Sequence, residues 1–323
     1  MSWVLGVDSG GSGLRIALRS VGDPARVLSA DPGEPLRTGP SGIDPGQLLR
    51  QLVPVAEELL SRAGAREPAA VAVGAAGMAT LGDGLRAELP AALARSLGVR
   101  RLALAADAVT AYAGALGQRA GVVVAAGTGM IALGTDLTAW HRADGWGHLL
   151  GDCGGGAWIG RAGLEAALRE HDGRRGGSPA LLAATEKFFG PVGGLPGLLY
   201  PRSDRPAVLA SFAPEVARAA AGDPVARSIL TAAAEQIAES AAAAGPSSGT
   251  YEVALTGGLF KLGEPLLTPL RAALAAGSPR ARTVPAAGDP LVGALDIAAA
   301  LATDTLRLPP DERLLYIPTQ QDR

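Results

Sequence analysis

The sequence carries the same local pattern twice. Residues 4–18 read VLGVDSGGSGLRIAL, and residues 121–134 read GVVVAAGTGMIALG. In both, an apolar run ends in a loop of small residues and a second apolar run follows at once, which is typical of two β-strands joined by a tight turn. Two such hairpins predict a chain with two similar α/β domains that face each other across a central cleft.

Between and after these hairpins, apolar runs alternate with helical periodicity. Asp44-Pro45 and Asp289-Pro290 are typical helix starts, because an aspartate caps a helix and a proline fits its first turn. The boundary between the halves is expected near 117–120, and the segment 303–323 is expected to be peripheral. Strands are expected at 69–77, 101–107 and 251–255, and helices at 45–64, 83–97, 263–276 and 290–302, with further helices within 156–245.

The composition excludes several classes of protein. A formal net charge of -2 over 323 residues gives no electrostatic reason to expect nucleic acid or an anionic membrane as a partner. Cys153 is the only cysteine, so an internal disulfide is excluded and a structural zinc site is disfavoured. We find no signal peptide and no apolar stretch of the ~18 residues that a membrane span needs. We therefore expect a soluble, cytoplasmic protein without nucleic-acid or membrane partners.

The first small-residue loop suits phosphate groups, because successive glycines let backbone N–H groups converge on an anion without interference from Cβ atoms. Asp8 precedes this loop and is a candidate to hold Mg²⁺ through water. The alternative is an ordinary glycine-rich turn. A Walker loop is excluded because no Gly-Lys-Ser/Thr occurs, and a dinucleotide-binding turn is disfavoured because a strand follows. The phosphate candidates are Gly10, Gly11, Ser12 and Gly13.

The second loop offers Gly127, Thr128 and Gly129 in the same position between two strands. Two loops of one design, one in each half, predict a site that grips a polyphosphate. A third stretch, TGGLF at 256–260, follows a strand and precedes a helix, and its Gly257 and Gly258 are candidates for adenine or ribose. For each loop taken alone, a plain turn is the alternative.

Asp107 ends the apolar strand 101–107 and precedes a helix. One interpretation is a helix N-cap, a position where aspartate is preferred. The other is a general base that accepts the proton of an attacking hydroxyl group. In phosphoryl transfer such a base acts beside Mg²⁺ and backbone dipoles, which align the phosphates and neutralise their charge.

The segment GWGHLLGDCGGGAWIG at 145–160 combines aromatic, acidic and small residues. Trp146 offers an apolar face to a sugar ring, and Asp152 offers two oxygens to adjacent hydroxyl groups. The alternative is a surface loop whose tryptophans belong to the core. Cys153 is expected to be a small packed residue, since nothing near it in the sequence would activate a thiol.

Taken in order, these segments resemble the N-acetylglucosamine kinase branch of the BadF/BadG/BcrA/BcrD ATPase family, within the actin/Hsp70/hexokinase superfamily. GVDSGGSG resembles the first phosphate loop of that family, AADA its catalytic aspartate segment and AAGTG its second phosphate loop. GWGHLLGD resembles its sugar loop, and TGGLF its adenosine loop. The resemblance covers essentially the whole chain.

The resemblance implies two ribonuclease-H-like domains, as in actin-like ATPases, that close on ATP, Mg²⁺ and an amino sugar. The domains are expected at 1–117, with helix 290–302 packed on it, and at 118–289. The resemblance also implies that Asp107 deprotonates the sugar 6-hydroxyl group, that Asp8 helps to place Mg²⁺, and that the protein is a homodimer. The residues expected near the sugar are Gly77, Asp107, Trp146, Gly147 and Asp152.

Several positions depart from the family pattern, and they concern the substrate. The second phosphate loop continues with Met130 and Ile131 where polar residues are usual, and Cys153 replaces a glutamate. The chain also contains no asparagine for the sugar hydroxyl groups. Because a hydroxyl-binding site discriminates through the groups it leaves unpaired, these departures bear on which sugar is bound. The resemblance implies N-acetylglucosamine or a close relative, such as glucosamine or N-acetylmuramic acid.

Two other functions fit the same fold. A BadF-type ATPase activator needs paired cysteines for an iron–sulfur cluster, and this chain has only Cys153. A sensor that binds sugar or nucleotide without catalysis would be expected to lack the base, whereas Asp107 is present. The sequence therefore favours an ATP-dependent amino-sugar kinase, with the sensor as the alternative.

Overall fold

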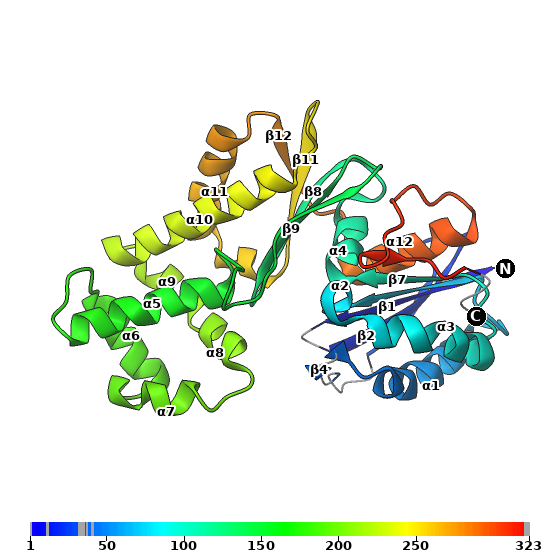
Figure 1. Ribbon diagram of the computed structural model, residues 1–323, viewed down its shortest axis with the longest axis horizontal. Coiled ribbons are helices and arrows are strands. Elements are labelled where there is room, and N and C mark those ends of the chain that lie inside the picture. The colour runs from blue at the N-terminus through cyan, green and yellow to red at the C-terminus, as the bar shows by residue number, and fades with distance from the viewer. Residues whose placement is uncertain (1, 11–12, 32–35, 37, 40–41, 320–323) are drawn as a thin grey trace. The chain divides into compact units, whose positions relative to one another are not determined.

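The computed structural model describes residues 2–10, 13–31, 36, 38–39 and 42–319. The chain divides into two compact units, drawn with its helices and strands in Figure 1. Unit 1 comprises residues 1–120, 136–140 and 285–323, and unit 2 comprises residues 121–135 and 141–284. The C-terminal segment therefore belongs to the same unit as the N-terminus.

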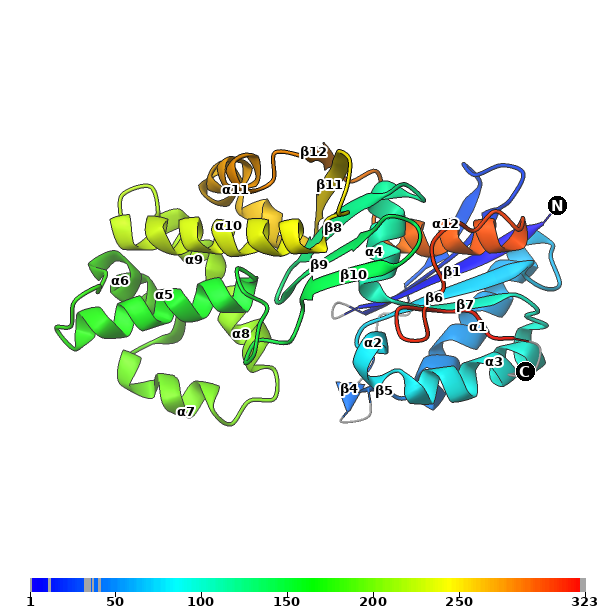
Figure 2. The same cartoon turned by 45° about the horizontal axis from the view of Figure 1, so that its top comes forward.

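Unit 1 is built on a six-stranded sheet with the order β13-β7-β6-β1-β2-β3. Helices α1 and α3 cover one face, and α4 and α12 cover the other (Figures 1 and 2). Its strands are β1 (Trp3–Gly10), β2 (Gly13–Ser20), β3 (Val27–Ala30), β6 (Ala70–Ala75), β7 (Leu102–Ala106) and β13 (Leu315–Tyr316), with a separate pair of β4 (Thr38–Gly39) and β5 (Gly42–Ile43). Its helices are α1 (Pro45–Ala63), α2 (Met78–Leu81), α3 (Asp83–Leu97), α4 (Asp107–Leu116) and α12 (Pro290–Ala302).

Unit 2 is built on a five-stranded sheet with the order β10-β9-β8-β11-β12. Its strands are β8 (Gly121–Ala126), β9 (Met130–Thr135), β10 (Trp140–Asp144), β11 (Tyr251–Thr256) and β12 (Ala281–Pro285). Its helices are α5 (Gly156–His171), α6 (Pro179–Phe189), α7 (Leu195–Leu199), α8 (Arg205–Ser211), α9 (Ala213–Ala219), α10 (Pro224–Ala244) and α11 (Glu264–Gly277), with 3-10 turns η1 (Val192–Gly194) and η2 (Gly258–Leu262).

The two sheets share one arrangement around their hairpins. In unit 1, β1 pairs with β2 in antiparallel and with β6 in parallel orientation. In unit 2, β8 pairs with β9 in antiparallel and with β11 in parallel orientation. The central strands are buried on both faces, which explains why they read as continuous apolar runs. The prediction of two α/β units, each begun by a hairpin, is confirmed.

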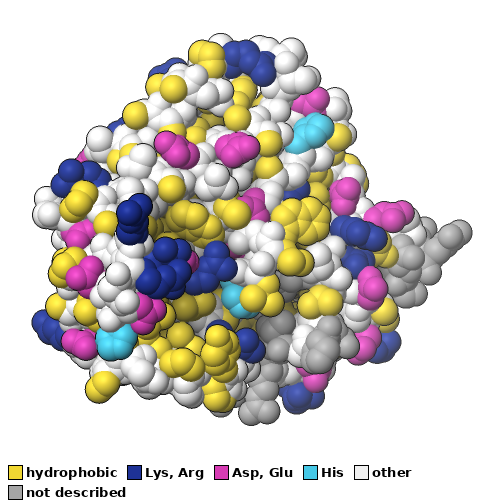
Figure 3. Space-filling view, turned by 60° about the vertical axis from the view of Figure 1, so that its left-hand side comes forward, with side chains coloured by type: hydrophobic (Ala, Val, Ile, Leu, Met, Phe, Trp, Pro, Cys, Tyr) yellow, Lys and Arg dark blue, Asp and Glu magenta, His cyan; other side chains and the backbone are white. Residues whose placement is uncertain are grey.

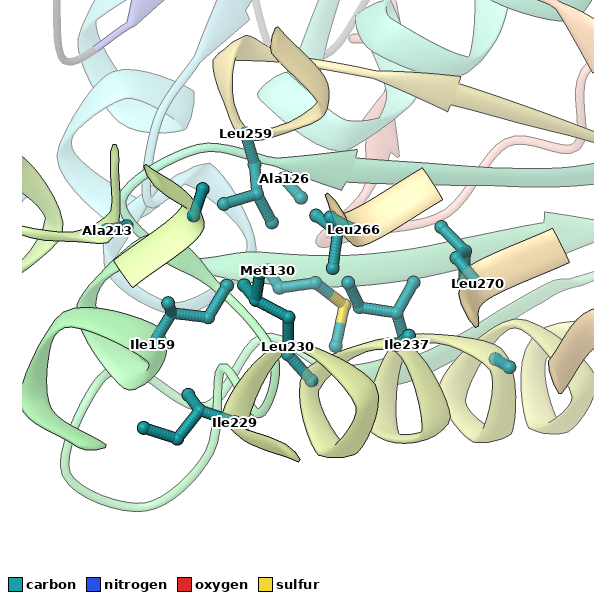
Figure 4. Packing of buried hydrophobic residues seen from close by; sticks show 14 of the residues in the cluster. Ala126, Met130, Ile159, Ala213, Ile229, Leu230, Ile237, Leu259, Leu266 and Leu270 are labelled. Carbon is teal, nitrogen blue, oxygen red and sulfur yellow. The ribbon is translucent and has the colours of Figure 1, made fainter. Parts of the chain in front are cut away.

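The core of unit 2 lies between its sheet and helices α10 and α11. Figure 4 shows Met130 of β9 among Leu230 and Ile237 of α10 and Leu266 of α11. The side chain of Met130 is 2% exposed. The residue after the second small-residue loop is therefore held by packing, and this packing fixes where the loop ends.

The segment after α12 differs from the expectation. It was expected to be peripheral, but Leu315 and Tyr316 form β13, which pairs with β7 at the edge of the sheet. Leu308 and Leu315 are buried. The two-residue strand is too short to give a periodic signal, and its partner lies about two hundred residues earlier, so local pattern could not reveal it. Among the described residues, every helix is too short or too polar to cross a lipid bilayer.

Gly293 is required where α12 crosses α4. A Cβ atom on Gly293 would lie 1.9 Å from the carbonyl oxygen of Thr110 and 2.4 Å from the backbone nitrogen of Gly114. Gly293→Ala is therefore expected to lower the free energy of unfolding by about 1–3 kcal/mol, as overpacking does. Urea denaturation measures this. Gly84→Ala is the control, because its Cβ would meet only Pro45, at 3.5 Å; equal losses in both variants would contradict the prediction.

Candidate active site

Three parallel strands of unit 1 end side by side and carry predicted site residues. β1, β6 and β7 are neighbours in the sheet. Asp8 lies near the end of β1, opposite Gly74 of β6. Gly77 follows β6 with a φ of 74° and begins α2, and Asp107 directly follows β7. Ligands of α/β sheets bind at the carboxyl ends of the strands. Asp8, Gly77 and Asp107 therefore form a candidate site, which we call the unit 1 edge.

Asp107 is the first residue of α4, and the N-cap position is occupied by Ala106. Its carboxylate accepts a hydrogen bond from the N–H of the adjacent Ala108, at 2.9 Å. A capping aspartate would instead bind N–H groups two or three positions beyond itself. The N-cap interpretation therefore fails, and the carboxylate is open to solvent.

The protein around Asp107 shifts its acidity. Desolvation by surrounding atoms raises the pKa of Asp107 to about 6, and the negative charge of Asp8 adds to this effect. The hydrogen bond from Ala108 opposes it. The residue is nevertheless exposed to solvent. A carboxylate with a pKa nearer neutrality is a better proton acceptor.

Asp8 is buried beside Arg15, a partner that the sequence did not reveal. Arg15 donates to Asp8 Oδ2 from Nε at 3.1 Å and from Nη2 at 2.5 Å. Arg15 also donates from Nη1 to Asp289 Oδ2 at 2.6 Å. Burial raises the pKa of Asp8, although Arg15 opposes the rise. Within the described residues, Asp8 Oδ1 has no hydrogen bond, so this oxygen is available to a water or a cation.

The tip of the first hairpin is described in part. Gly10 and Gly13 pair across it, and Gly13 has a φ of 134°. No described atom lies within 4 Å of the position that a Cβ on Gly13 would take. Gly11 and Ser12 lie outside the described residues. The described part of this tip therefore leaves room for a ligand against the backbone.

The unit 2 edge, which we define as Gly127–Gly129, Asp152 and Gly257, lies where β8 and β11 end in parallel. Gly257 has a φ of 102°, and a Cβ on it would lie 2.2 Å from the carbonyl oxygen of Ala126. The carbonyls of Gly127 and Thr128 accept hydrogen bonds from the first turn of α5, at 2.9 and 2.8 Å. Within the described residues the N–H groups of Thr128 and Gly129 make no hydrogen bond. Two neighbouring unpaired N–H groups suit an anion.

Asp152 lies against the second small-residue loop. A Cβ on Gly129 would lie 2.3 Å from Asp152 Oδ2. Asp152 Oδ1 accepts a hydrogen bond from the N–H of Gly147 at 3.0 Å. Trp146 is 65% exposed and stacks on Arg142, with 4.1 Å from the guanidinium carbon to the ring centroid. The structure thus brings the predicted sugar loop and the second phosphate loop together, and Trp146 is not a core residue.

Asp144 is a residue of this cluster that the sequence did not reveal. Its Oδ1 accepts a hydrogen bond from the N–H of Asp152 at 2.7 Å, and its Oδ2 accepts one from the N–H of Cys153 at 2.8 Å. Asp144 has a φ of 59°. It therefore ties the two ends of the loop 145–151 together. The available signal was the Asp-Gly dipeptide before Trp146, since aspartate side chains bind backbone N–H groups in turns.

The residues that depart from the family pattern have structural environments of their own. Met130 points into the core (Figure 4). Ile131 packs under Gly145, where a Cβ would come within 3.0 Å of three of its carbons. Burial and the adjacent Asp144 raise the pKa of the Cys153 thiol, which disfavours a reactive thiolate.

The Asp144 carboxylate is expected to stabilise the conformation of the loop 145–151 through its two hydrogen bonds. Asp144→Ala removes two hydrogen bonds to a charged acceptor, each of which contributes about 1.5–3 kcal/mol. We expect the amides of Asp152 and Cys153 to exchange hydrogen at least about 10-fold faster, as measured by NMR. Asp136→Ala, at an exposed turn of unit 1, is the control. Unchanged exchange at 152 and 153 would show that Asp144 does not hold this loop.

Comparisons with known proteins agree with the fold. Residues 5–298 match the sequence profile of the BadF/BadG/BcrA/BcrD ATPase family. The chain belongs to this family. The matched range includes both hairpins.

Three relatives are especially informative. The N-acetylmuramic acid/N-acetylglucosamine kinase of Clostridium acetobutylicum is 32% identical over 181 residues, which are 54% of this chain and 56% of that protein. The match therefore spans little more than half of either protein. A provisionally named N-acetylglucosamine kinase from Chromobacterium violaceum has a similar structure, with a TM-score of 0.71 and 29% identity over 94% of this chain and 99% of its own. Another, from Porphyromonas gingivalis, has a TM-score of 0.66 over 94% of this chain and 100% of its own, but at 16% identity it supports the fold alone.

Proposed function

We propose that this protein is an ATP-dependent kinase that transfers the γ-phosphoryl group of ATP to the 6-hydroxyl group of an amino sugar. The observation that carries the proposal is Asp107, an accessible carboxylate with a pKa of about 6 at the carboxyl end of β7. It does not cap its helix, so its position needs another explanation. A general base for a hydroxyl group supplies one.

In the proposed reaction, Asp107 accepts the proton of the sugar hydroxyl as its oxygen attacks the γ-phosphorus, and ADP leaves. The phosphate chain would accept hydrogen bonds from the unpaired N–H groups of Thr128 and Gly129, and Gly10 and Gly13 would let it approach the first hairpin. Gly257 and Gly258 would lie against the adenosine.

Mg²⁺ fits the donor set of unit 1. This ion is usually bound by one or two carboxylates together with water and substrate phosphates. Asp8 offers one such carboxylate oxygen, because Arg15 uses only Oδ2. Among the described residues, no group of three or more His, Cys, Asp or Glu side chains is placed to hold a metal without a substrate. When bound, Mg²⁺ would neutralise phosphate charge.

N-acetylglucosamine and N-acetylmuramic acid are the proposed substrates, with glucosamine as a close relative. The name of the C. acetobutylicum relative supports the first two. In the proposed complex Trp146 packs on the sugar ring, while Asp152 and the backbone of Gly147 and Gly77 contact its hydroxyl groups. A homodimer, suggested by the family resemblance, stays a prediction that sedimentation would test.

The test is ADP release from Mg-ATP with N-acetylglucosamine, N-acetylmuramic acid, glucosamine, N-acetylmannosamine and glucose. Acceleration by an amino sugar, with the 6-phosphate as product, would support the proposal. Sugar binding without any increase in ADP release would favour the sensor and contradict the kinase. No binding and no turnover with any sugar would contradict both.

The pKa of Asp107 predicts how the reaction depends on pH. A base works in its deprotonated form, so kcat is expected to reach a plateau above pH 7 and to fall toward tenfold per pH unit well below about 6. The direction follows because lower pH protonates the carboxylate. A pH series of kcat from 5 to 8, with sugar and ATP saturating, measures this. A kcat that rises toward pH 5 would contradict the role of Asp107.

A further inference from the structure

Unit 2 has an apolar hollow beside the loop 145–151. Its volume is about 560 Å³, within the range of about 300–1,000 Å³ that is usual for small-molecule pockets. It lies between α5, the η1–α7 segment and α8. Figure 3 shows hydrophobic side chains around a hollowed part of this face, with basic side chains next to them. The main apolar lining residues are Leu164, Leu168, Val192, Leu195, Leu199 and Leu209.

Exposed apolar side chains gather at the same place. Tyr200 and Leu149 line the hollow and are 76% and 75% exposed. Trp146 and Leu150, from the same loop as Leu149, are 65% and 85% exposed. Single exposed apolar residues are common, but a contiguous apolar group on a surface usually marks a binding site.

The charged groups around the hollow do not favour a cationic ligand. Glu165 is already paired with Arg169 at 2.8 Å, and Asp172 lies 3.9 Å from Arg174. The lining carboxylates are thus neutralised by arginines of the surface. Arg161 and Arg205 also line the hollow, so its charged groups favour a neutral or anionic ligand, and the wall of leucines favours an apolar part of that ligand.

The hollow is continuous with the loop that we propose binds the sugar. His148 and Leu149 line the hollow. The adjacent Gly147 donates its N–H to Asp152. The loop residues assigned to the sugar and those that line the hollow are therefore neighbours in the chain.

We propose that this hollow binds an apolar substituent of the amino sugar, such as an N-acyl chain longer than acetyl. The inference rests on the proposed function, because it assigns the sugar to Trp146 and Asp152. The substrate class becomes amino sugars with an apolar substituent. The chain enters the hollow past His148 and displaces water from Leu168 and Leu199. The sugar hydroxyl groups and the phosphoryl transfer are unaffected.

The experiment compares N-acetyl-, N-butanoyl- and N-hexanoylglucosamine as substrates. If each added methylene group is buried, kcat/KM should rise up to roughly fourfold per methylene. In Leu168→Gln, whose side chain is half-buried in the wall, this gain should be lost while the value for N-acetylglucosamine stays. Val27→Gln, an exposed position on β3 of unit 1, is the control and should keep the gain.

The outcomes separate the two proposals. Turnover of N-acetylglucosamine without any gain from longer chains would overturn the hollow as a substrate site and leave the kinase intact. Turnover of none of the three would overturn the kinase. Calorimetry of N-hexanoylglucosamine with wild type and Leu168→Gln would then still test the hollow as a binding site. Equal binding by the two proteins, or no binding by either, would overturn that proposal. A wild-type dimer that Leu168→Gln converts to monomer would assign the hollow to a second copy of the chain and also overturn the proposal.

Discussion

Asp107→Asn is expected to lower kcat for sugar phosphorylation by roughly 10²–10⁴-fold, the usual contribution of a general base. Asparagine has nearly the same shape and keeps an oxygen that can accept the hydrogen bond from Ala108, but it cannot take up a proton. ATP binding should persist, because the substitution removes a negative charge and leaves both small-residue loops unchanged. Steady-state rates and calorimetric titration with ATP measure the two quantities.

The control for Asp107→Asn is Asp83→Asn. Asp83 also lies in the first turn of a helix of unit 1 and pairs with Arg86 at the surface. It should keep full activity, which separates loss of a base from loss of any helix-start aspartate. A variant Asp107→Asn that retained more than about one tenth of kcat would contradict the base. Loss of ATP binding and activity together would point to a structural role instead.

Much of the secondary structure could be predicted from local pattern. The helix expected at 83–97 is α3, with the same bounds, and the helices expected at 45–64 and 290–302 are α1 and α12 within one residue. These helices were predictable because their start and stop signals are short-range. Asp44 caps α1 by accepting from the N–H of Gln47, and Gly64 ends it with a φ of 68°.

Residues of the candidate site could be predicted only where they belong to a short motif that is local in sequence. Small-residue loops and the aspartate after β7 are visible in sequence because each lies within a few residues of a strand end. The Arg15–Asp289 contact joins residues 274 positions apart, and no local pattern encodes it. Asp144 was missed for another reason: its partners are near in sequence, but their hydrogen bonds depend on the positive φ angles of Asp144 and Asp152, which non-glycine residues rarely adopt.

Gly127→Ala is expected to weaken ATP binding without harming the fold. Apart from the two chain neighbours of Gly127, no atom of the described residues lies within 4 Å of the position that a Cβ on Gly127 would take, and its φ lies outside the left-handed region. Alanine should therefore leave the free energy of unfolding unchanged or raise it slightly, by about 0.4–1 kcal/mol, since the unfolded chain loses freedom. If phosphate oxygens lie against this backbone, the added methyl group occupies their space. We expect the Kd for ATP to rise at least about tenfold, which corresponds to about 1.4 kcal/mol.

Two matched variants make the Gly127→Ala result specific. Gly222→Ala adds a methyl group at another open position of unit 2; it should have the same small effect on the free energy of unfolding as Gly127→Ala and should not change ATP affinity. Gly129→Ala should act differently, because its Cβ would push against Asp152 and so raise KM for the sugar as well as Kd for ATP. Calorimetry with ATP, kinetics with sugar and urea denaturation separate these effects. If Gly127→Ala bound ATP as tightly as wild type, the loop after β8 would not contact the phosphates, and the free N–H groups of Thr128 and Gly129 would need another ligand.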